Sequence, residues 1–555
     1  MALKNFKFPF RLETRSRRAI SNYKLKRSQL LKIGLFLAIV ILAVVLRFYK
    51  LGQNPPGLYW DETVFGYDAY SLLKTGKDHH GVTLPLFFES FGDWKLPVYH
   101  YLLIPSIAVF GLNEFAVRFP SAFLGSITVL VFFWVIKQLT KNINLSLFSM
   151  LFLAISPWHI QFSRAAFESV AGFFFFMLGL YIFLIALNKK KTFFFSISFL
   201  SFVLSMYSYH AYRIFTPIMI LVILLIYLRE LRKMFSSLVI PVIIAFVVFL
   251  PLLTFTFSAN GRARALSQSV FSKSEFETAR IYFGQNSKIP LRFISGYWSK
   301  PVYYSSVAIN NYIDHFSPIF LFVNGDQTGR HSQVDMGQIF SFELILIAIS
   351  FFMLKRFDQK AVKLLLAMLF IAPIPAIIVN PSPHAYRTLQ MAVPLAFLSG
   401  LGMYYLFLNM RVRVVQLVLA GVIIYSFFTY LHLVFIHYPR KFSADWQDGN
   451  KQMVEKLQQF QEGFDRVYIS NITQVPYIYV LFFQKYDPQK FISEKGNKDT
   501  FDKYVFTSDD FDLYNKGRIL YVAPPWKKVG GIWLAAANDT NGQHIYYLWE
   551  INGKN

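Results

Sequence analysis

The chain has 555 residues, of which 55% are hydrophobic and only 16% are charged. This composition excludes a soluble globular protein of this size and predicts a polytopic α-helical membrane protein. The formal net charge is +25, but the basic residues stand between apolar runs and do not gather in one soluble segment. We therefore attribute them to membrane orientation and expect no binding of nucleic acid. The absence of cysteine excludes disulfides and thiolate metal sites.

The first 32 residues hold ten lysines and arginines against one acid, Glu13. They precede the apolar run 33–46, which leads directly into Arg47 and Tyr49 without a small-residue cleavage site. This pattern predicts an uncleaved first membrane span, with residues 1–32 as a basic cytoplasmic tail.

Eleven further apolar runs follow, and several are shorter than the roughly 20 residues that a perpendicular span needs. They cover residues 97–112, 120–137, 145–157, 169–187, 193–208, 214–228, 236–256, 341–354, 364–379, 388–408 and 414–435. If run 97–112 does not cross, fourteen basic residues fall in the inside loops, against one in each of three short outside loops. The positive-inside rule therefore predicts eleven spans, with 97–112 as a re-entrant or interfacial helix.

This topology divides the chain into the tail 1–32, a transmembrane domain 33–437 with external loops 47–118 and 258–340, and an external domain 438–555. The second loop is too long to be a simple connection, so we expect short helices in it, over the site. Residues 438–555 combine a predicted helix, Trp446–Phe464, with the strand-like runs RVYISNI, RILYVAP and HIYYLWEI. They are typical of a small extracytoplasmic α/β domain.

The unusual polar residues of this topology, outside the basic inside loops, all fall at the external ends of the spans. They are Asp61, Glu62, Lys95, Arg164, Glu168, His210, Arg213, His384 and Arg387. A transporter would instead place such groups near the bilayer midplane. The pattern favours an enzyme that works at the outer surface on a lipid-borne substrate.

Several motifs resemble one family of membrane enzymes. One segment of the chain is similar to the first external loop of protein O-mannosyltransferase-like enzymes; it contains PPGLYWDE, GYDAY, TGKDHHG and DWKLPVYHYL. This family includes the dolichyl-phosphate-mannose-protein mannosyltransferases and the aminoarabinose transferases. VRFPSAFLG resembles their Arg-x-Pro helix, and ISPWHIQFSRAAFES resembles the second external loop of the wider fold. With SPIFLFVNGDQTGRH and NPSPHAYRTLQ, the resemblance covers roughly residues 33–435. It implies the GT-C fold.

The resemblance also implies roles for three carboxylates. Asp61 would be the base that takes a proton from the acceptor hydroxyl, although an aspartate here could also cap a helix that begins at Glu62. Glu62 would orient the acceptor or complement the helix dipole. Glu168 takes the place of the second acid, and with Asp61 it could hold a divalent cation. We assign no metal ligand and no certain cofactor.

Basic residues would hold the phosphate of the lipid donor. Lys95 stands where relatives carry a Lys-Pro motif, although this chain has WKLP and lacks one of the prolines. Arg164, Arg213 and Arg387 have guanidinium groups that match phosphate oxygens, or they could pair with acids as part of the structure. His384 is a further phosphate candidate.

The remaining polar candidates are less defined. His79, His80, His210 and His384 do not have the spacing of a zinc motif. In the segment 320–331, Asp326 or His331 could touch the acceptor.

We therefore predict an integral glycosyltransferase of the cell membrane. It would move a sugar, by default mannose, from a polyprenyl-phosphate carrier to a protein, lipid or glycan acceptor on the outer face. One alternative is a transporter or flippase of lipid-linked sugars, which would tolerate loss of the Asp61 carboxylate. Another is a membrane-anchored assembly protein, which would fail on truncation near residue 438.

Overall fold

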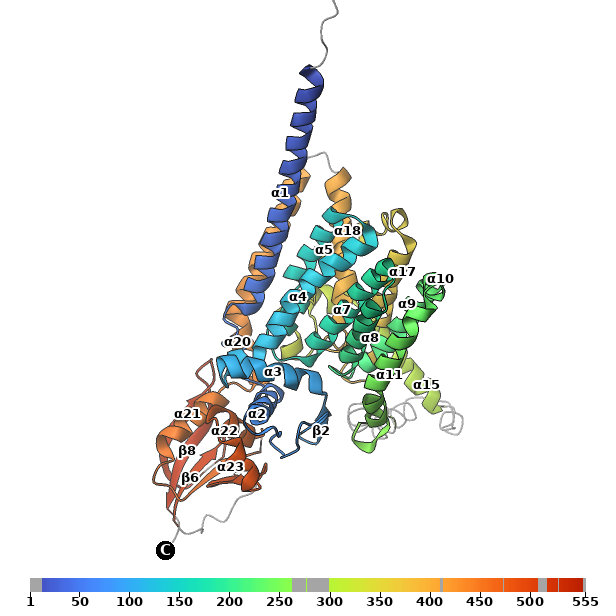
Figure 1. Cartoon of the computed structure of the whole chain (residues 1–555). Coiled ribbons are helices and arrows are strands. Elements are labelled where there is room, and N and C mark those ends of the chain that lie inside the picture. Colours follow the sequence, from blue (N-terminus) through green and yellow to red (C-terminus); the bar gives the residue numbers. More distant parts are fainter. Residues whose placement is uncertain are drawn as a thin grey trace, which may run out of the picture.

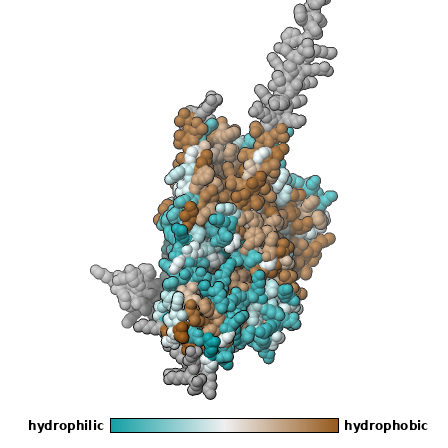
Figure 2. Space-filling model, turned by 90° about the vertical axis from the view of Figure 1, so that its left-hand side faces the viewer, coloured by the Kyte–Doolittle hydropathy of each residue, from teal (hydrophilic) through white to brown (hydrophobic). Residues whose placement is uncertain are grey.

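The protein is described by a computed structural model over residues 12–261, 276, 299–409, 413–472, 474–507, 517–527 and 529–552. Helices form a bundle, and a small sheet domain lies at one end of it (Figure 1). On the face that Figure 2 shows, apolar residues cover the upper part, around the bundle, and hydrophilic residues cover the lower part. The molecule thus separates a membrane region from a water-exposed region.

All twelve predicted apolar runs are largely helical, because an α-helix satisfies its backbone polar groups internally where lipid offers no partner. The helices are α1 (Leu12–Phe48), α3 (Pro97–Phe110), α4 (Glu114–Thr140), α5 (Ile143–Ile155), α7 (Glu168–Lys189), α8 (Thr192–Met206), α9 (Tyr212–Ile226), α11 (Phe235–Phe257), α16 (Glu343–Ser350), α17 (Gln359–Ile371), α18 (Ala392–Asn409) and α19 (Arg413–His432). Shorter helices are α6 (Pro157–Ser163), α10 (Leu228–Arg232), α15 (Ser299–Asp314) and α20 (Tyr438–Lys441).

The number of spans depends on how the short helices are counted. Within the described residues, seven helices are long and apolar enough to cross a membrane, or eight if the bent pair α5–α6 is one span. Of the other predicted runs, α8 and α9 have 15 residues each and α16 has only eight. The membrane character is confirmed, and the count of eleven stays a prediction.

Helix α1 differs from the prediction at its start. It begins at Leu12, about twenty residues before the expected span, and it runs to Phe48 without a break. The segment from Leu12 to Lys32 contains neither proline nor glycine, so nothing in it stops the helix from extending out of the membrane. The basic tail is therefore continuous with the first span over its described part.

The first external loop forms a compact layer under the bundle. It contains α2 (Trp60–Thr75), the hairpin of β1 (Phe88–Ser90) and β2 (Asp93–Lys95), and α3. Helix α3 has 14 residues, or about 21 Å, which is short of the roughly 30 Å of a bilayer core. Figure 1 shows it lying across the lower end of the bundle, as an interfacial helix would.

The second external loop bears short helical segments where it is described. They are α15, a π-helical turn at Ile319–Val323 and a 3₁₀ turn at Gly329–His331. Residues 262–275 and 277–298 of this loop, where further short helices could lie by the prediction, are outside the described residues. Further 3₁₀ or π turns occur at Leu354–Arg356, Ile374–Ala376, Leu389–Met391, Leu433–His437 and Ala444–Trp446.

The C-terminal region is an α/β domain, as predicted. Its six-stranded mixed sheet has the order β4-β5-β3-β6-β8-β7, with β3 parallel to both β5 and β6. The strands are β3 (Arg466–Ser470), β4 (Thr500–Phe501), β5 (Tyr504–Thr507), β6 (Arg518–Ala523), β7 (Ile532–Asn538) and β8 (His544–Asn552). The helices are α21 (Asn450–Phe460), α22 (Pro476–Phe483) and α23 (Pro488–Ser493). The predicted helix is shorter at both ends, because Gly449 precedes it in a left-handed conformation and the chain turns after Phe460.

Helix α2 lies between the membrane bundle and the C-terminal domain, and Gly66 permits the close approach. A Cβ atom at this position would stand 2.6 Å from Phe482 of α22 and 2.7 Å from Val117 of α4. Both of these side chains are buried, so neither can move away at little cost. The missing side chain of Gly66 therefore sets the spacing of three elements.

We expect Gly66→Ala to lower the free energy of unfolding by about 1–3 kcal/mol, because the added methyl overpacks the junction. The sign of this change is informative, because the same substitution in an unconstrained helix raises the free energy of unfolding by about 0.5–1 kcal/mol. Gly34→Ala is the matched control, because a Cβ there meets no atom within 4 Å. Thermal unfolding of the purified protein in detergent measures both. A Gly66→Ala protein as stable as the Gly34→Ala protein would contradict this packing.

Candidate active site

A cavity of about 270 Å³ lies at the junction of the bundle, the first external loop and the C-terminal domain. Its walls come from segments that are distant in the sequence. Six of the predicted site residues line it, namely Asp61, Glu62, Glu168, His331, His384 and Arg387. Three more lining residues, Arg330, Tyr386 and Trp446, were not assigned a role from the sequence.

Asp61 is the second residue of α2 and does not cap it. The helix begins at Trp60, and the extended Tyr59 is its N-cap, so the alternative of an Asp61 cap on a helix starting at Glu62 is wrong. A carboxylate in the first turn is still favoured by the helix dipole. The Asp61 side chain is 32% exposed and faces the cavity, where its Oδ1 lies 3.1 Å from Lys95 Nζ.

Lys95 ends strand β2, and the helix α3 begins two residues later. Its ammonium group is almost completely buried between two carboxylates, because Asp93 Oδ2 lies 3.4 Å away on the other side. A buried ammonium is stable only with such partners. Lys95 therefore contacts Asp61, which lines the cavity, and its positive charge lies at the edge of the cavity.

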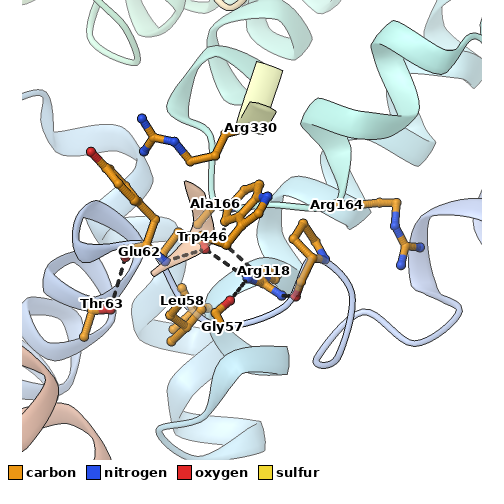
Figure 3. A network of polar contacts seen from close by, with 12 residues as sticks. Gly57, Leu58, Glu62, Thr63, Arg118, Arg164, Ala166, Arg330 and Trp446 are labelled. Atoms are coloured by element: carbon orange, nitrogen blue, oxygen red, sulfur yellow. Dashed lines mark hydrogen bonds and ion pairs between the residues drawn. The ribbon is translucent and has the colours of Figure 1, made fainter. Parts of the chain in front are cut away.

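Glu62 is held in a network of polar contacts (Figure 3). Arg118 of α4 donates two hydrogen bonds, each 3.0 Å long, from Nε and Nη2 to the Glu62 carboxylate. The same carboxylate accepts hydrogen bonds from the backbone N–H groups of Ala166, at 2.8 Å, and Tyr59, at 3.2 Å. Four donors occupy the oxygens of Glu62, which favours a positioning role for this residue over contact with the acceptor.

Arg118 completes this network on its other side. It donates to the carbonyl oxygens of Pro55, at 2.7 Å, and of Leu51, at 3.3 Å, and also to that of Gly57. The Trp446 ring lies 5.6 Å from its guanidinium carbon. The Arg-x-Pro motif contains this arginine, and an arginine inside an otherwise apolar run was the signal that could have marked it.

Glu168 is the first residue of α7 and is buried, with Tyr386 donating a hydrogen bond from its hydroxyl group to Oε2. Asp61 and Glu168 line the same cavity, which leaves the expectation of a shared cation open. Among the described residues, however, no third carboxylate or imidazole joins them in a group able to hold a metal ion.

The basic side of the cavity contains Arg387, His384 and Arg330. The guanidinium of Arg330 stacks on the Tyr59 ring, 3.3 Å from its centre, and Arg330 lines the cavity. In the described part of the chain, no acid pairs with Arg330 within 4 Å. Burial lowers the pKa of His384 well below its ordinary value, and the nearby His331 and Arg387 lower it further.

Asp326 lies beside these groups, close to His331 and His384. Burial alone would raise the pKa of Asp326, but His331, His384 and the backbone N–H of Thr328 lower it to about 2. The carboxylate is therefore ionised at neutral pH.

Two predicted phosphate ligands lie outside the cavity. Arg164 is fully buried, and its guanidinium donates to the carbonyl oxygens of Leu46, at 2.8 Å, and of Asn54, at 2.7 Å. Figure 3 shows it pointing away from the Glu62 network. Arg213 donates to Thr256 Oγ1 at 3.4 Å. Both arginines thus contact protein groups outside the cavity, and the phosphate roles predicted for them stay predictions.

We expect Glu62→Gln to lower the free energy of unfolding by about 3–5 kcal/mol, because Arg118 would keep a buried charge without its anion. The control is Lys451→Ala, which removes a partly exposed ion pair with Glu114 of 2.7 Å and should cost less than about 1 kcal/mol. Thermal unfolding compares the two. Equal and small decreases in the free energy of unfolding would show that the ion pair between Glu62 and Arg118 is not a structural constraint.

Comparisons with known proteins bear on this site. The sequence pattern of the family described as dolichyl-phosphate-mannose-protein mannosyltransferase matches residues 37–260. A protein of Aquifex aeolicus (strain VF5), itself described as uncharacterized, is 29% identical over 160 residues. That match spans 29% of this chain and only 31% of the relative.

Solved structures extend the likeness to the whole fold. ArnT from Cupriavidus metallidurans bound to undecaprenyl phosphate superposes with a TM-score of 0.53 over 94% of this chain and 99% of ArnT, at 11% identity. The apo state of the same protein gives 0.53 at 12% identity, with the same coverage. The comparisons lend no support to the transporter alternative. The resemblance inferred from the motifs is confirmed: this is a multi-pass membrane protein of the GT-C fold, whose residues 37–260 match the dolichyl-phosphate-mannose-protein mannosyltransferase family.

Proposed function

We propose that the chain is a glycosyltransferase that moves one sugar, by default mannose, from a polyprenyl monophosphate to the hydroxyl group of an acceptor. The observation that carries this proposal is the pairing of a cavity-facing carboxylate, Asp61, with Lys95 at 3.1 Å, next to a cavity with further cations. The family match and the ArnT complex with undecaprenyl phosphate support the donor class. A protein, a lipid or a glycan remains open as the acceptor.

Asp61 would act as the base. As the acceptor oxygen attacks the anomeric carbon, the carboxylate takes the hydroxyl proton, and the bond between this carbon and the phosphate oxygen breaks. The electron pair leaves with the polyprenyl phosphate, so no acid is required, but the increased negative charge must be stabilised. Glu62 holds the first turn of α2, and with it Asp61, in place.

Lys95, Arg330 and Arg387 would hold the phosphate. All three lie at the cavity or at its edge, and guanidinium groups match phosphate oxygens bidentately. Arg330 replaces Arg164 and Arg213 in this role. The contact with the Tyr59 ring holds the guanidinium of Arg330 in place, and no described acid neutralises its charge.

An apolar groove of about 330 Å³ between α8, α9 and α11 would take the isoprenoid chain of the donor. Met206 and Val203 line this groove and belong to the same buried apolar cluster as Leu96, the neighbour of Lys95. This cluster lies between the groove and the charged edge of the cavity. An apolar path that ends at a cation matches the two ends of a polyprenyl phosphate.

We further infer that residues 1–32 are cytoplasmic, that residues 33–437 form the transferase domain, and that the domain 438–555 faces outward. In Figure 1, the start of α1 and the C-terminal domain lie at opposite ends of the molecule. The basic start of the chain would therefore stay inside, while the cavity opens at the outer face of the cell membrane.

We expect Asp61→Asn to lower transfer by about 10²–10⁴-fold, because the amide cannot accept the proton. The assay follows label from polyprenyl-phosphate mannose, and then from other lipid-linked sugars, in membranes that contain matched amounts of folded protein. Asp93→Asn is the control, since it removes the other carboxylate near Lys95, at 3.4 Å, without touching the base. Comparable transfer by the two variants would reject Asp61 as the base.

Arg330→Gln should lower kcat/KM for the lipid donor roughly 10–150-fold, which corresponds to about 1.5–3 kcal/mol for a hydrogen bond to a charged group. Arg356→Gln removes an exposed guanidinium on the predicted inner side and should leave kcat/KM unchanged. Steady-state kinetics with varied donor measures both. An effect of equal size in the two variants would mean that Arg330 acts only through the general charge of the protein.

A further inference from the structure

Three side chains with the ligand types of a zinc site meet in the wall of the cavity. They are Asp326 and His331 of the second external loop and His384 of the loop before α18. One ligand atom of each lies within 4.8 Å of the others. His331 and His384 line the cavity directly.

The two imidazoles each bury a nitrogen atom that has no hydrogen-bond partner. Nδ1 of His331 and Nδ1 of His384 are both inaccessible to water, and neither contacts a donor or acceptor at hydrogen-bond distance. A buried polar atom without a partner costs free energy, and one such atom in each of two neighbouring imidazoles needs an explanation. A bound cation would supply the missing partner for both.

Asp326 is positioned as metal-ligating carboxylates are. Its Oδ1 accepts a hydrogen bond from the backbone of Thr328 at 2.8 Å, and its Oδ2 accepts one from the backbone of Ala385 at 2.7 Å. These bonds fix the carboxylate and leave lone pairs on both oxygens. Such supporting contacts orient the ligands of metal sites.

The distance between His331 and Asp326 fits a shared ion better than a direct bond. Nδ1 lies 3.6 Å from Oδ2, which is too long for a hydrogen bond. Two ligands bound at about 2.0–2.1 Å in a tetrahedral zinc site stand about 3.4 Å apart. The observed spacing requires only a small adjustment to admit the ion.

We propose that Asp326, His331 and His384 bind one divalent transition-metal ion of the zinc class, with a further coordination position open to the cavity. Two imidazoles favour zinc or a similar ion over Mg²⁺ and Ca²⁺, which prefer oxygen ligands. The open position would take a water molecule or an oxygen of a substrate. The site would also tie the second external loop to the loop before α18, across the wall of the cavity.

Zinc binding by the full-length chain tests this proposal without any sugar donor. Protein purified in detergent, without a histidine tag, is stripped with a chelator, loaded with Zn²⁺, desalted and analysed for metal content. We expect the wild type to retain one zinc ion per chain. His331→Gln and His384→Gln should each lose it. The melting temperature of neither variant should rise on addition of Zn²⁺, whereas that of the wild type should.

A double variant, His432→Gln with His437→Gln, is the matched control. These exposed histidines have Nε2 atoms 3.0 Å apart and could bind zinc adventitiously. Retention of zinc by this control, together with a rise in the melting temperature of the wild type on addition of Zn²⁺ but not of Mg²⁺, supports the proposal. A wild type that retains no zinc, or His331 and His384 variants that retain as much as the wild type, would overturn it. Either result leaves the transferase proposal standing, because that rests on Asp61 and the donor assay.

Discussion

The ion pair between Glu62 and Arg118 is the constraint on which the outer end of the molecule depends. Arg118 belongs to a long bundle helix, whereas Glu62 belongs to the first turn of α2, so their two hydrogen bonds of 3.0 Å join the membrane domain to the external layer. The remaining donors of Arg118 hold the carbonyl groups that precede α2. As a result, the residue beside Glu62, Asp61, has a fixed place at the cavity.

Buried arginines have a similar structural task elsewhere at this end of the bundle. Arg47 donates to the carbonyl oxygens of Leu153 and Ala154 at the end of α5, and Arg164 donates to that of Leu46 near the end of α1. The last carbonyl groups of a helix have no partner within the helix, and near lipid there is little water to replace one. A guanidinium group with five donors can satisfy several of them at once. This need explains why a lone arginine in an uncharged loop is a weak signal for phosphate binding.

The sequence allowed the fold to be predicted well because membrane spans and strands leave local patterns. The apolar runs coincide with helices, and RVYISNI, RILYVAP and HIYYLWEI match β3, β6 and β8 to within two residues. The prediction also grouped Asp61, Glu168 and Arg387 on the outer side of the membrane, because each lies next to the outer end of a predicted span. The structure brings all three to one cavity. The sequence could not reveal that four hydrogen bonds occupy Glu62, because its partners come from distant segments. His384 is 53 positions from His331, so no spacing rule for zinc ligands connects them.

The C-terminal domain is part of the site, and this affects how its role can be studied. Gln447 accepts a hydrogen bond from the backbone of Trp60 at 2.9 Å, and Tyr479 donates one to the carbonyl oxygen of Leu58 at 3.1 Å. Gly66 packs against Phe482 of the same domain, so the start and the middle of α2 both rest on it. Truncation near residue 438 would release α2 and displace Asp61. Loss of function on truncation is therefore expected of an enzyme as well as of an assembly protein, and only single substitutions at the cavity distinguish the two.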